Sequence, residues 1–261
     1  MRDNFEMIIR HFPTNEGITI IPVSDVHLGA QECYEKDWDK FCRDLLDSKN
    51  TYVVLVGDLV NNGIKSSVTN VYEERMRPKE QKSRMVRNLT PIRERILCAV
   101  SGNHEARNLR EVDNDITYDI MAKLDLEDIY REDIAFLKLQ FGRKESNGLR
   151  NPTYTFAITH GNGSSIYTGA SATKAERFGM AIDGIDCLVV GHTHKPMNYP
   201  VGKIMVDKQN NRVSVVSWRL IVSTSWLGYS SYAVRKLLTP TANLKQQIML
   251  AGNKKLLEVV G

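Results

Sequence analysis

Short apolar runs rich in β-branched residues recur along the first two thirds of the chain. Each is bounded by polar or turn-forming residues, which is the pattern of buried strands. The runs lie at residues 18–23, 52–56, 95–100, 134–141, 154–159 and 186–190. Segments with helical spacing lie between the first three runs, at 37–48 and at about 72–89. The pattern therefore predicts strand–helix–strand units.

Beyond residue 194 the chain becomes strand-rich. The pattern predicts strands at 201–206, 212–218 and 219–226, a short helix near 231–238 and a closing hairpin over 246–260. The polar residues 144–152 are interpreted as a loop. Without a repeat or a linker, we expect one domain over residues 1–261. Residues 1–16 would be its N-terminal extension, and residues 195–261 the strand-rich C-terminal part of the same domain.

The composition is that of an ordinary globular protein, with 42% hydrophobic and 25% charged residues. A net charge of +4 mildly favours nucleic acid or phosphate without requiring either. The N-terminus does not have the apolar stretch of a signal peptide, and apolar runs are too short for a membrane span, so we expect a soluble, cytoplasmic protein. The four cysteines do not form a Cys-x-x-Cys pair, and are predicted to be small core residues: Cys33, Cys42, Cys98 and Cys187.

The placement of histidine is the strongest chemical signal in the sequence. Of the six histidines, only His11 does not lie at or just past the C-terminal end of a predicted strand. In open α/β sheets ligands bind beyond the carboxyl ends of the strands, so the other five side chains should converge on one cleft. They are His27, His104, His160, His192 and His194.

Carboxylate and amide side chains accompany these histidines. Asp25 and His27 are two residues apart, and in extended backbone such side chains point to the same side and can reach one cation together. Asp58 ends a strand in Gly-Asp, and its two oxygens could bridge two cations, although a helix N-cap is the alternative. Asn103 offers a metal a neutral oxygen, which leaves the adjacent His104 to meet substrate; a turn is the alternative. Taken together, these sites favour a metal centre.

The order Asp-x-His, Gly-Asp, Gly-Asn-His-Glu, His and Gly-His-x-His over residues 25–194 closely resembles the calcineurin-like metallophosphoesterase superfamily. The expected fold is a four-layer α/β/β/α sandwich of two mixed β-sheets flanked by helices. The resemblance implies two divalent metal ions, with manganese preferred and iron, zinc or magnesium as alternatives. It puts one ion on Asp25, His27, Asp58 and His194. It puts the other on Asp58, Asn103, His160 and His192, so that Asp58 is the bridge.

Such a centre suits phosphate because the charge of two divalent ions exceeds that of two aspartates. A bridging water, acidified toward hydroxide, would attack phosphorus in line, and His104 would protonate or hydrogen-bond to the departing oxygen. We therefore expect a dinuclear-metal-dependent phosphodiesterase or nuclease acting on nucleic acid or nucleotides. The alternatives are a phosphomonoesterase and a non-catalytic binding or scaffold module of the same fold, although the complete ligand set argues against the module.

Several features bear on the substrate. Where Ser/Thr protein phosphatases of this superfamily have Asp-Arg-Gly, this chain has Asn61-Asn62-Gly63, which disfavours that activity. Arg107 could replace the missing anion contact, or be an ordinary surface arginine. The run Ser-Asp-Val-His-Leu-Gly-Ala at 24–30 resembles the double-strand-break repair nuclease branch.

Further features would allow a DNA or RNA partner. Eight Lys or Arg against two Glu between Arg75 and Arg95 could follow a nucleic-acid backbone, or form a solvated helix face. Four aromatic residues could stack on a base or belong to the core: Tyr167, Trp226, Tyr229 and Tyr232. The oligomeric state is left open, with a homodimer as one option.

Overall fold

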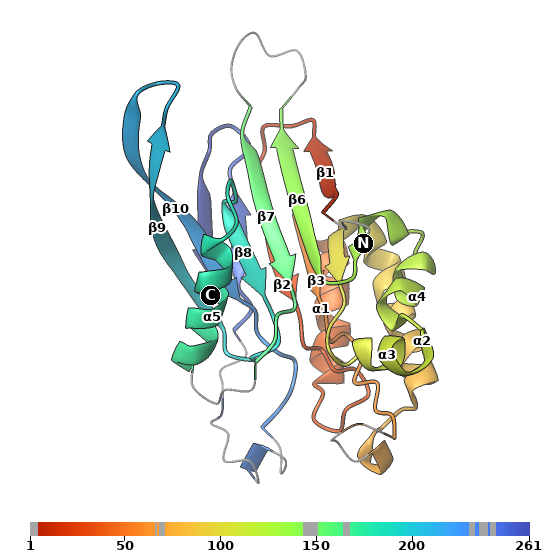
Figure 1. The fold of residues 1–261 in the computed structure, drawn as a ribbon. Helices are drawn as coiled ribbons and strands as arrows, with labels where there is room; N and C mark the ends of the chain where they lie inside the picture. The colour runs from red at the N-terminus through yellow and green to blue at the C-terminus, as the bar shows by residue number, and fades with distance from the viewer. Residues whose placement is uncertain are drawn as a thin grey trace.

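The computed structural model describes residues 5–65, 67, 71–142, 151–163, 168–229, 233–234, 240 and 244–261. Two six-stranded mixed sheets face each other (Figure 1). The first has the order β1-β6-β7-β8-β10-β9, with bounds Met7–Phe12, Ile134–Phe141, Thr153–Thr159, Cys187–Val190, Arg212–Val222 and Met197–Asp207. The second has the order β12-β11-β2-β3-β4-β5, with bounds Leu257–Val260, Gln247–Leu250, Ile18–Val23, Thr51–Val56, Ile96–Val100 and Tyr130–Arg131.

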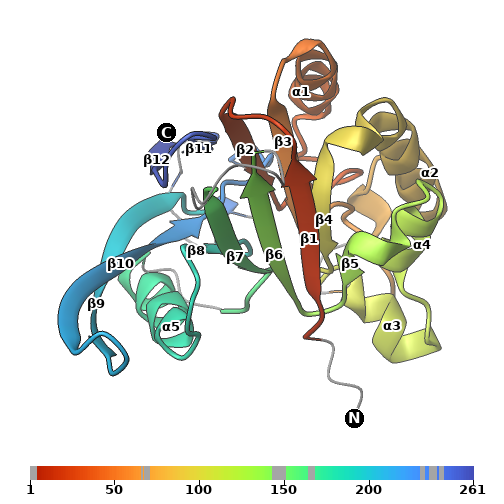
Figure 2. The same cartoon turned by 90° about the horizontal axis from the view of Figure 1, so that it is seen from above.

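Helices cover both outer faces of this pair of sheets. The second sheet is flanked by α1 (Glu35–Asp47), α2 (Pro78–Leu89), α3 (Ala106–Val112) and α4 (Ile116–Ala122), whereas α5 (Thr168–Met180) lies against the first (Figure 2). Short 3-10 turns occur at Val71–Glu73, Thr90–Arg95 and Glu127–Ile129. The predicted four-layer α/β/β/α arrangement is confirmed.

The hydrophobic pattern explains how the sheets pack. In β6 every second residue is buried, so Ala135, Leu137, Leu139 and Phe141 face the opposite sheet while the alternate residues face outward. In β4 all five residues are buried, as expected for a parallel strand covered on both faces. The second sheet therefore has little tolerance for polar substitution in its central strands.

The six predicted strands of the first two thirds of the chain are all present, with small differences at their ends. The closing hairpin is confirmed, since β11 pairs antiparallel with β12. Much of the predicted loop at 144–152 and of the predicted helix at 231–238 lies outside the described residues.

Three local predictions were wrong. The run 212–226 is one strand that ends at Val222. The Ser223 amide makes the last hydrogen bond to β8, at Val190 O, whereas the Trp226 amide donates outside the sheet, to Asp25 O. The second helix begins at Pro78 and not near residue 72, since proline suits the first turn of a helix. The N-terminal extension contains a strand that the pattern missed, β1, which pairs in parallel with β6.

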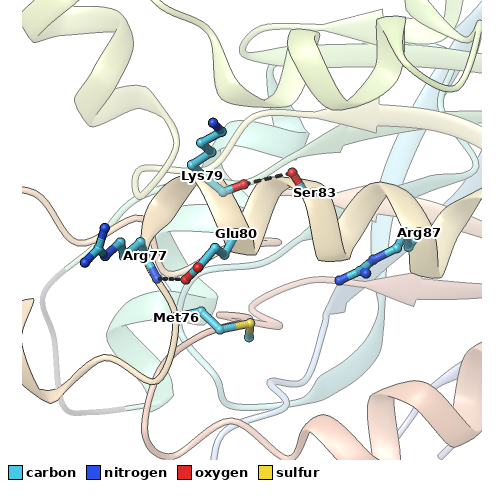
Figure 3. A pocket seen from close by; sticks show the side chains of 6 residues that line it. All are labelled: Met76, Arg77, Lys79, Glu80, Ser83 and Arg87. Carbon is cyan, nitrogen blue, oxygen red and sulfur yellow. Dashed lines mark hydrogen bonds between the residues drawn. The ribbon is translucent and has the colours of Figure 1, made fainter.

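The basic segment 75–95 runs through α2, and much of its charge is compensated. Four of its cations lie within ion-pair distance of a carboxylate. The pairs are Arg75 with Glu35, Lys82 with Asp119, Arg84 with Asp39 and Arg93 with Asp125. A shallow groove is lined by three other basic residues, Arg77, Lys79 and Arg87, together with Met76, Glu80 and Ser83 (Figure 3). The excess of positive charge counted in the sequence of this segment is therefore much smaller on the folded surface.

The four cysteines are buried and free, as predicted. Burial raises the pKa of Cys33, Cys42 and Cys98 to about 12, so their reactive thiolate forms are scarce at neutral pH. We expect the native protein to react slowly with a disulfide reagent such as Ellman's reagent, and the denatured protein to react fast at all four thiols. Absorbance of the released thiolate measures this, and rapid reaction of the native protein would contradict the burial.

Candidate active site

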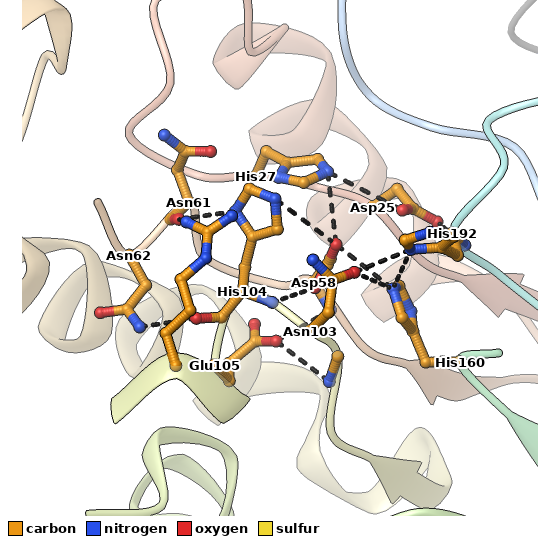
Figure 4. A network of polar contacts seen from close by, with 12 residues as sticks. Asp25, His27, Asp58, Asn61, Asn62, Asn103, His104, Glu105, His160 and His192 are labelled. Atoms are coloured by element: carbon orange, nitrogen blue, oxygen red, sulfur yellow. Dashed lines mark hydrogen bonds and ion pairs between the residues drawn. The ribbon is translucent and has the colours of Figure 1, made fainter. Parts of the chain in front are cut away.

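The predicted site residues lie in loops that follow the carboxyl ends of strands from both sheets. Asp25 and His27 follow β2, Asp58 follows β3, and Asn103 and His104 follow β4. His160 follows β7 of the first sheet, and His192 and His194 follow β8. The structure brings these eight side chains into one cluster, and Figure 4 labels all of them except His194. Strands from both sheets thus supply one site between their ends.

The backbone at these positions differs from the extended form inferred for the first pair. Five of the clustered residues adopt the left-handed region, with φ of 53° at Asp25, 48° at His27, 51° at Asp58, 70° at His192 and 55° at His194. Non-glycine residues rarely adopt this conformation, which costs on the order of 1 kcal/mol or more each. Neighbouring loops hold it in place, since the amides of Asp25 and His27 donate to the carbonyls of Gly57 and Asp58. Strained backbone held in this way is typical of functional sites.

Two glycines make room for the cluster. Gly57 has a φ of 81°, and a Cβ there would lie 2.7 Å from Gly102 and 2.8 Å from Nδ1 of His160. A Cβ on Gly102 would lie 2.2 Å from the backbone nitrogen and Oδ1 of Asp58. Side chains at either position would therefore push the strand ends apart, which explains the Gly-Asp and Gly-Asn-His pattern in physical terms.

The first group consists of Asp25, His27 and His194, whose ligand atoms all lie within 4.8 Å of one another. Nε2 of His194 is 2.9 Å from Oδ1 of Asp25 and 3.4 Å from Nε2 of His27. Among the described residues, Oδ1 of Asp25 is buried and accepts no well-aligned hydrogen bond, although the ring nitrogens of His194 and His27 lie 2.9 and 3.8 Å away. A metal ion bound among these atoms would supply the positive charge that favours a buried carboxylate oxygen.

The second group consists of Asp58, His160 and His192, joined by Asn103. Oδ1 of Asn103 lies 3.1 Å from Nε2 of His160 and 2.7 Å from Nδ1 of His192. The outer ring nitrogens face carbonyls, with Nδ1 of His160 at 2.7 Å from Val56 O and Nε2 of His192 at 2.7 Å from Gly163 O. Carbonyls only accept, so these outer nitrogens carry protons, and each inner nitrogen would offer its lone pair to a metal ion when it carries none.

Asp58 lies between the two groups. Its Oδ2 is 3.7 Å from Nε2 of His27 and 3.2 Å from Nε2 of His160. Ligand atoms that share one metal ion are separated by about 3 to 3.5 Å when each lies about 2.0 to 2.2 Å from it, so these spacings suit an ion on either side of Asp58. The residues present therefore fit a divalent metal site.

The electrostatics of the cluster favour bound cations. Burial would raise the pKa of Asp58, but His160 and His104 hold it well below its ordinary value, so this carboxylate is charged at neutral pH. Burial would lower the pKa of His160, but the charge of Asp58 raises it to about 10. The same negative charge that holds a proton on His160 would attract a divalent cation in its place.

His104 and Arg107 lie on the His27 side of the cluster. Nδ1 of His104 donates to Asn61 O at 2.7 Å, and its Nε2 is 3.8 Å from Oδ2 of Asp58. Burial and the adjacent His27 lower the pKa of His104 to about 3. Arg107 is half-buried and donates to Oγ of Ser67 at 3.2 Å, so it is neither a free surface residue nor in contact with the carboxylates.

Glu105 is the main residue that the sequence interpretation left without a role. Its side chain is completely buried, and its two oxygens accept hydrogen bonds from the backbone amides of Asp58, Val60 and Gly102 at 3.0 to 3.1 Å. Burial and the charge of Asp58 raise the pKa of Glu105 to about 7. Glu105 therefore ties the Asp58 loop to the Asn103 loop, and its place directly after Asn-His was the available signal.

Asn61 and Asn62, seen in the sequence only as a departure from the protein-phosphatase motif, support His104. The side chain of Asn62 donates to His104 O at 2.7 Å, and Asn61 supplies the carbonyl that faces the His104 ring. The side chain of Asn61 donates to the Glu74 carboxylate, and the side chain of the buried Gln81 accepts from the backbone amide of Asn62. These asparagines thus fix the orientation of His104.

A cavity of about 600 Å³ opens beside the cluster. Asn103, His160, Gly191 and Thr193 line its inner end, whereas His104 and Arg107 are not among its lining residues. Of the aromatic residues considered for stacking, Trp226 packs in the core against Trp38 and Phe41, Tyr229 is half exposed, and Tyr167 and Tyr232 lie outside the described residues.

No described helix is long and apolar enough to cross a membrane.

A comparison with family models identifies the family of this chain. The family model of the calcineurin-like phosphoesterases matches residues 18–196. No curated protein sequence gives a significant match. The chain is similar to the structure of a predicted phosphoesterase from Streptococcus pneumoniae, with 12% identity, a TM-score of 0.37 and coverage of 94% of this chain and 97% of the other. It is also similar to the calcineurin-like phosphoesterase YfkN from Bacillus subtilis, with 11% identity, a TM-score of 0.39 and coverage of 90% and 85%. The match over most of the chain, which spans every residue of the cluster, means that this protein belongs to the calcineurin-like phosphoesterases, a family of metal-dependent phosphoric ester hydrolases.

Proposed function

We propose that the protein is a dinuclear-metal-dependent phosphodiesterase that acts on nucleotides or nucleic acid. Asp25, His27, Asp58 and His194 would hold one divalent ion, and Asp58, Asn103, His160 and His192 the other. When bound, the two ions supply Lewis acidity and a water of lowered pKa. Manganese is our preferred ion for these nitrogen and oxygen ligands, with iron, zinc and magnesium as alternatives.

The observation that carries a diester is that histidines flank Asp58 on both sides, with a cavity beside one of them. His27 and His104 lie on one side of this carboxylate and His160 and His192 on the other (Figure 4). The cavity of about 600 Å³ opens from the His160 side. A phosphodiester has two organic substituents, and this arrangement gives one of them a cavity while the other lies toward His104. A phosphomonoester has only one organic substituent and would occupy only one of these two sides.

His104 is our candidate for the group that meets the leaving oxygen. Its Nδ1 is held by Asn61 O, so Nε2 is the atom that is free to face substrate. The negative charge of a bound phosphoryl group would raise the low pKa of this imidazole and favour the protonated form, which can donate to the departing oxygen. Arg107 stands next to this position and would contact a phosphoryl oxygen after a change of rotamer.

Replacing His104 with Asn tests this role. We expect His104→Asn to lower kcat for a phosphodiester by about a hundredfold, because general acid assistance is lost, while metal affinity changes much less. Steady-state kinetics and metal titration on the same preparation measure the two effects. Equal losses in kcat and in metal affinity would assign His104 to metal binding instead.

Hydrolysis of chromogenic esters tests the function as a whole. We expect purified protein in manganese to hydrolyse bis-p-nitrophenyl phosphate with a kcat/KM at least about tenfold above that for p-nitrophenyl phosphate, and to lose both activities in EDTA. The reverse preference would indicate a phosphomonoesterase. A panel of single-stranded DNA, duplex DNA, RNA and cyclic nucleotides, repeated with other metals, would then identify the natural diester.

A further inference from the structure

One face of each of two helices lines the cavity beside His160. From α3 these are Ala106, Leu109 and Arg110, spaced three and four residues apart. From α5 they are Ser171, Lys174, Ala175 and Phe178, spaced in the same way. Residues at such spacings share one side of a helix. The cavity is thus bordered by two regular surfaces, and its inner end reaches two proposed metal ligands, Asn103 and His160.

Two apolar residues on these surfaces, Leu109 and Phe178, lie outside the buried core, whereas Ala175 belongs to it. The helix α3 has no buried residue, so Leu109 contributes little to packing. Phe178 is 45% exposed, although its neighbour Gly179 is buried against the ring of Trp218. An aromatic ring and a leucine left accessible next to a strongly polar cluster are suited to an apolar, flat ligand group.

Charged residues at the same cavity define the rest of the ligand. Lys174 and Arg110 bring positive charge, and Lys174 also donates to the side chain of Asn162. Glu132 and Asp133 add acceptors on the side of the cavity formed by the loop before β6. A ligand with an aromatic base, sugar hydroxyls and a phosphate matches this combination, whereas a fatty acyl chain would leave the charged residues without partners.

On this basis we propose that the cavity binds a nucleoside that remains attached to the phosphoryl group during hydrolysis, with its base stacked on Phe178. The proposal rests on the proposed phosphodiesterase function and narrows its substrate to esters of nucleosides. A volume of about 600 Å³ is within the range of small-molecule sites and admits one nucleoside. Phe178 is then a specificity-determining residue that takes no part in the chemical step.

Direct binding tests the proposal without turnover. Calorimetric titration in manganese should show adenosine 5′-monophosphate binding at least about tenfold more tightly than ribose 5-phosphate, because base–aromatic stacking is worth about that much. Phe178→Ala should reduce this preference to about twofold, and Phe178→Tyr should retain it. Met180→Ala is the matched control, since Met180 is an exposed apolar residue of the same helix that does not line the cavity. Equal affinities for the two ligands in the unmodified protein would overturn the proposal.

Hydrolysis separates this proposal from the function on which it rests. The probes are the p-nitrophenyl esters of thymidine 5′-phosphate and of methyl phosphate, in which water adds to phosphorus and p-nitrophenolate departs with the electrons of its P–O bond. We expect Phe178→Ala to lower kcat/KM for the thymidine ester about tenfold, through KM, and to leave the methyl ester unchanged. If the unmodified protein hydrolyses both esters at equal rates, the nucleoside site is ruled out and the phosphodiesterase function stands. If it binds the nucleotide but hydrolyses neither ester, the phosphodiesterase function is ruled out and the nucleoside site stands.

Discussion

Asp58→Asn is expected to lower kcat/KM for bis-p-nitrophenyl phosphate by at least about a thousandfold, because the substitution removes the charge shared by both ligand groups. Asparagine has nearly the same shape and can still accept the hydrogen bond that the His104 amide donates to Oδ1 at 2.8 Å. The fold should therefore survive while the attraction for cations falls. Because Asp58 is the ligand proposed for both ions, this substitution should weaken metal binding at both groups at once.

Metal content and activity have to be measured together to interpret this variant. We expect bound metal, determined by elemental analysis after dialysis, to fall along with activity, and the circular dichroism spectrum to stay the same. Asp125→Asn is a suitable control, because the Asp125 side chain is 86% exposed and faces Arg93 on the surface. A variant that keeps substantial activity with a full complement of metal would show that Asp58 is not the bridge.

Glu105→Ala is expected to lower the free energy of unfolding by about 3 to 5 kcal/mol, since three buried backbone amides would lose their common acceptor. These amides belong to Asp58, Val60 and Gly102, so the Asp58 loop and the Asn103 loop would also lose their connection. Glu105→Gln retains one carbonyl oxygen and should lose about 1 to 3 kcal/mol. Activity should fall in both variants, although Glu105 touches neither substrate nor the ligand atoms.

Urea denaturation followed by tryptophan fluorescence measures the effect. The control is Glu94→Ala, because the Glu94 side chain is 84% exposed and its surface ion pair with Arg93 should contribute less than about 1 kcal/mol. An unfolding free energy of Glu105→Ala close to that of the unmodified protein would mean that water replaces the carboxylate. Glu105 would then have no structural role at the site.

The sequence by itself determined most strands of the sandwich and the residues of the cluster. Strands such as β6 and β4 are specified by the polarity of successive residues, which depends only on which faces are buried. The cluster could be predicted because its residues directly follow such strands, and the carboxyl ends of neighbouring parallel strands meet at one edge. Glu105 could be located but not interpreted, because nothing in the local pattern shows which amides it would accept.

The tertiary structure alone decided the features that depend on distant segments. β1 is a strand because β6, more than a hundred residues away in the sequence, offers it a parallel partner. The left-handed backbone at Asp25 and His192 is held by contacts between loops, and the cation surplus of 75–95 is reduced by carboxylates from other helices. The cavity beside His160 exists because α3 and α5, which cover different sheets, border the same space, so Phe178 had no significance in the sequence. Periodicity reports which residues are buried, whereas pairing, strain and cavities are properties of segments that meet only in the folded chain.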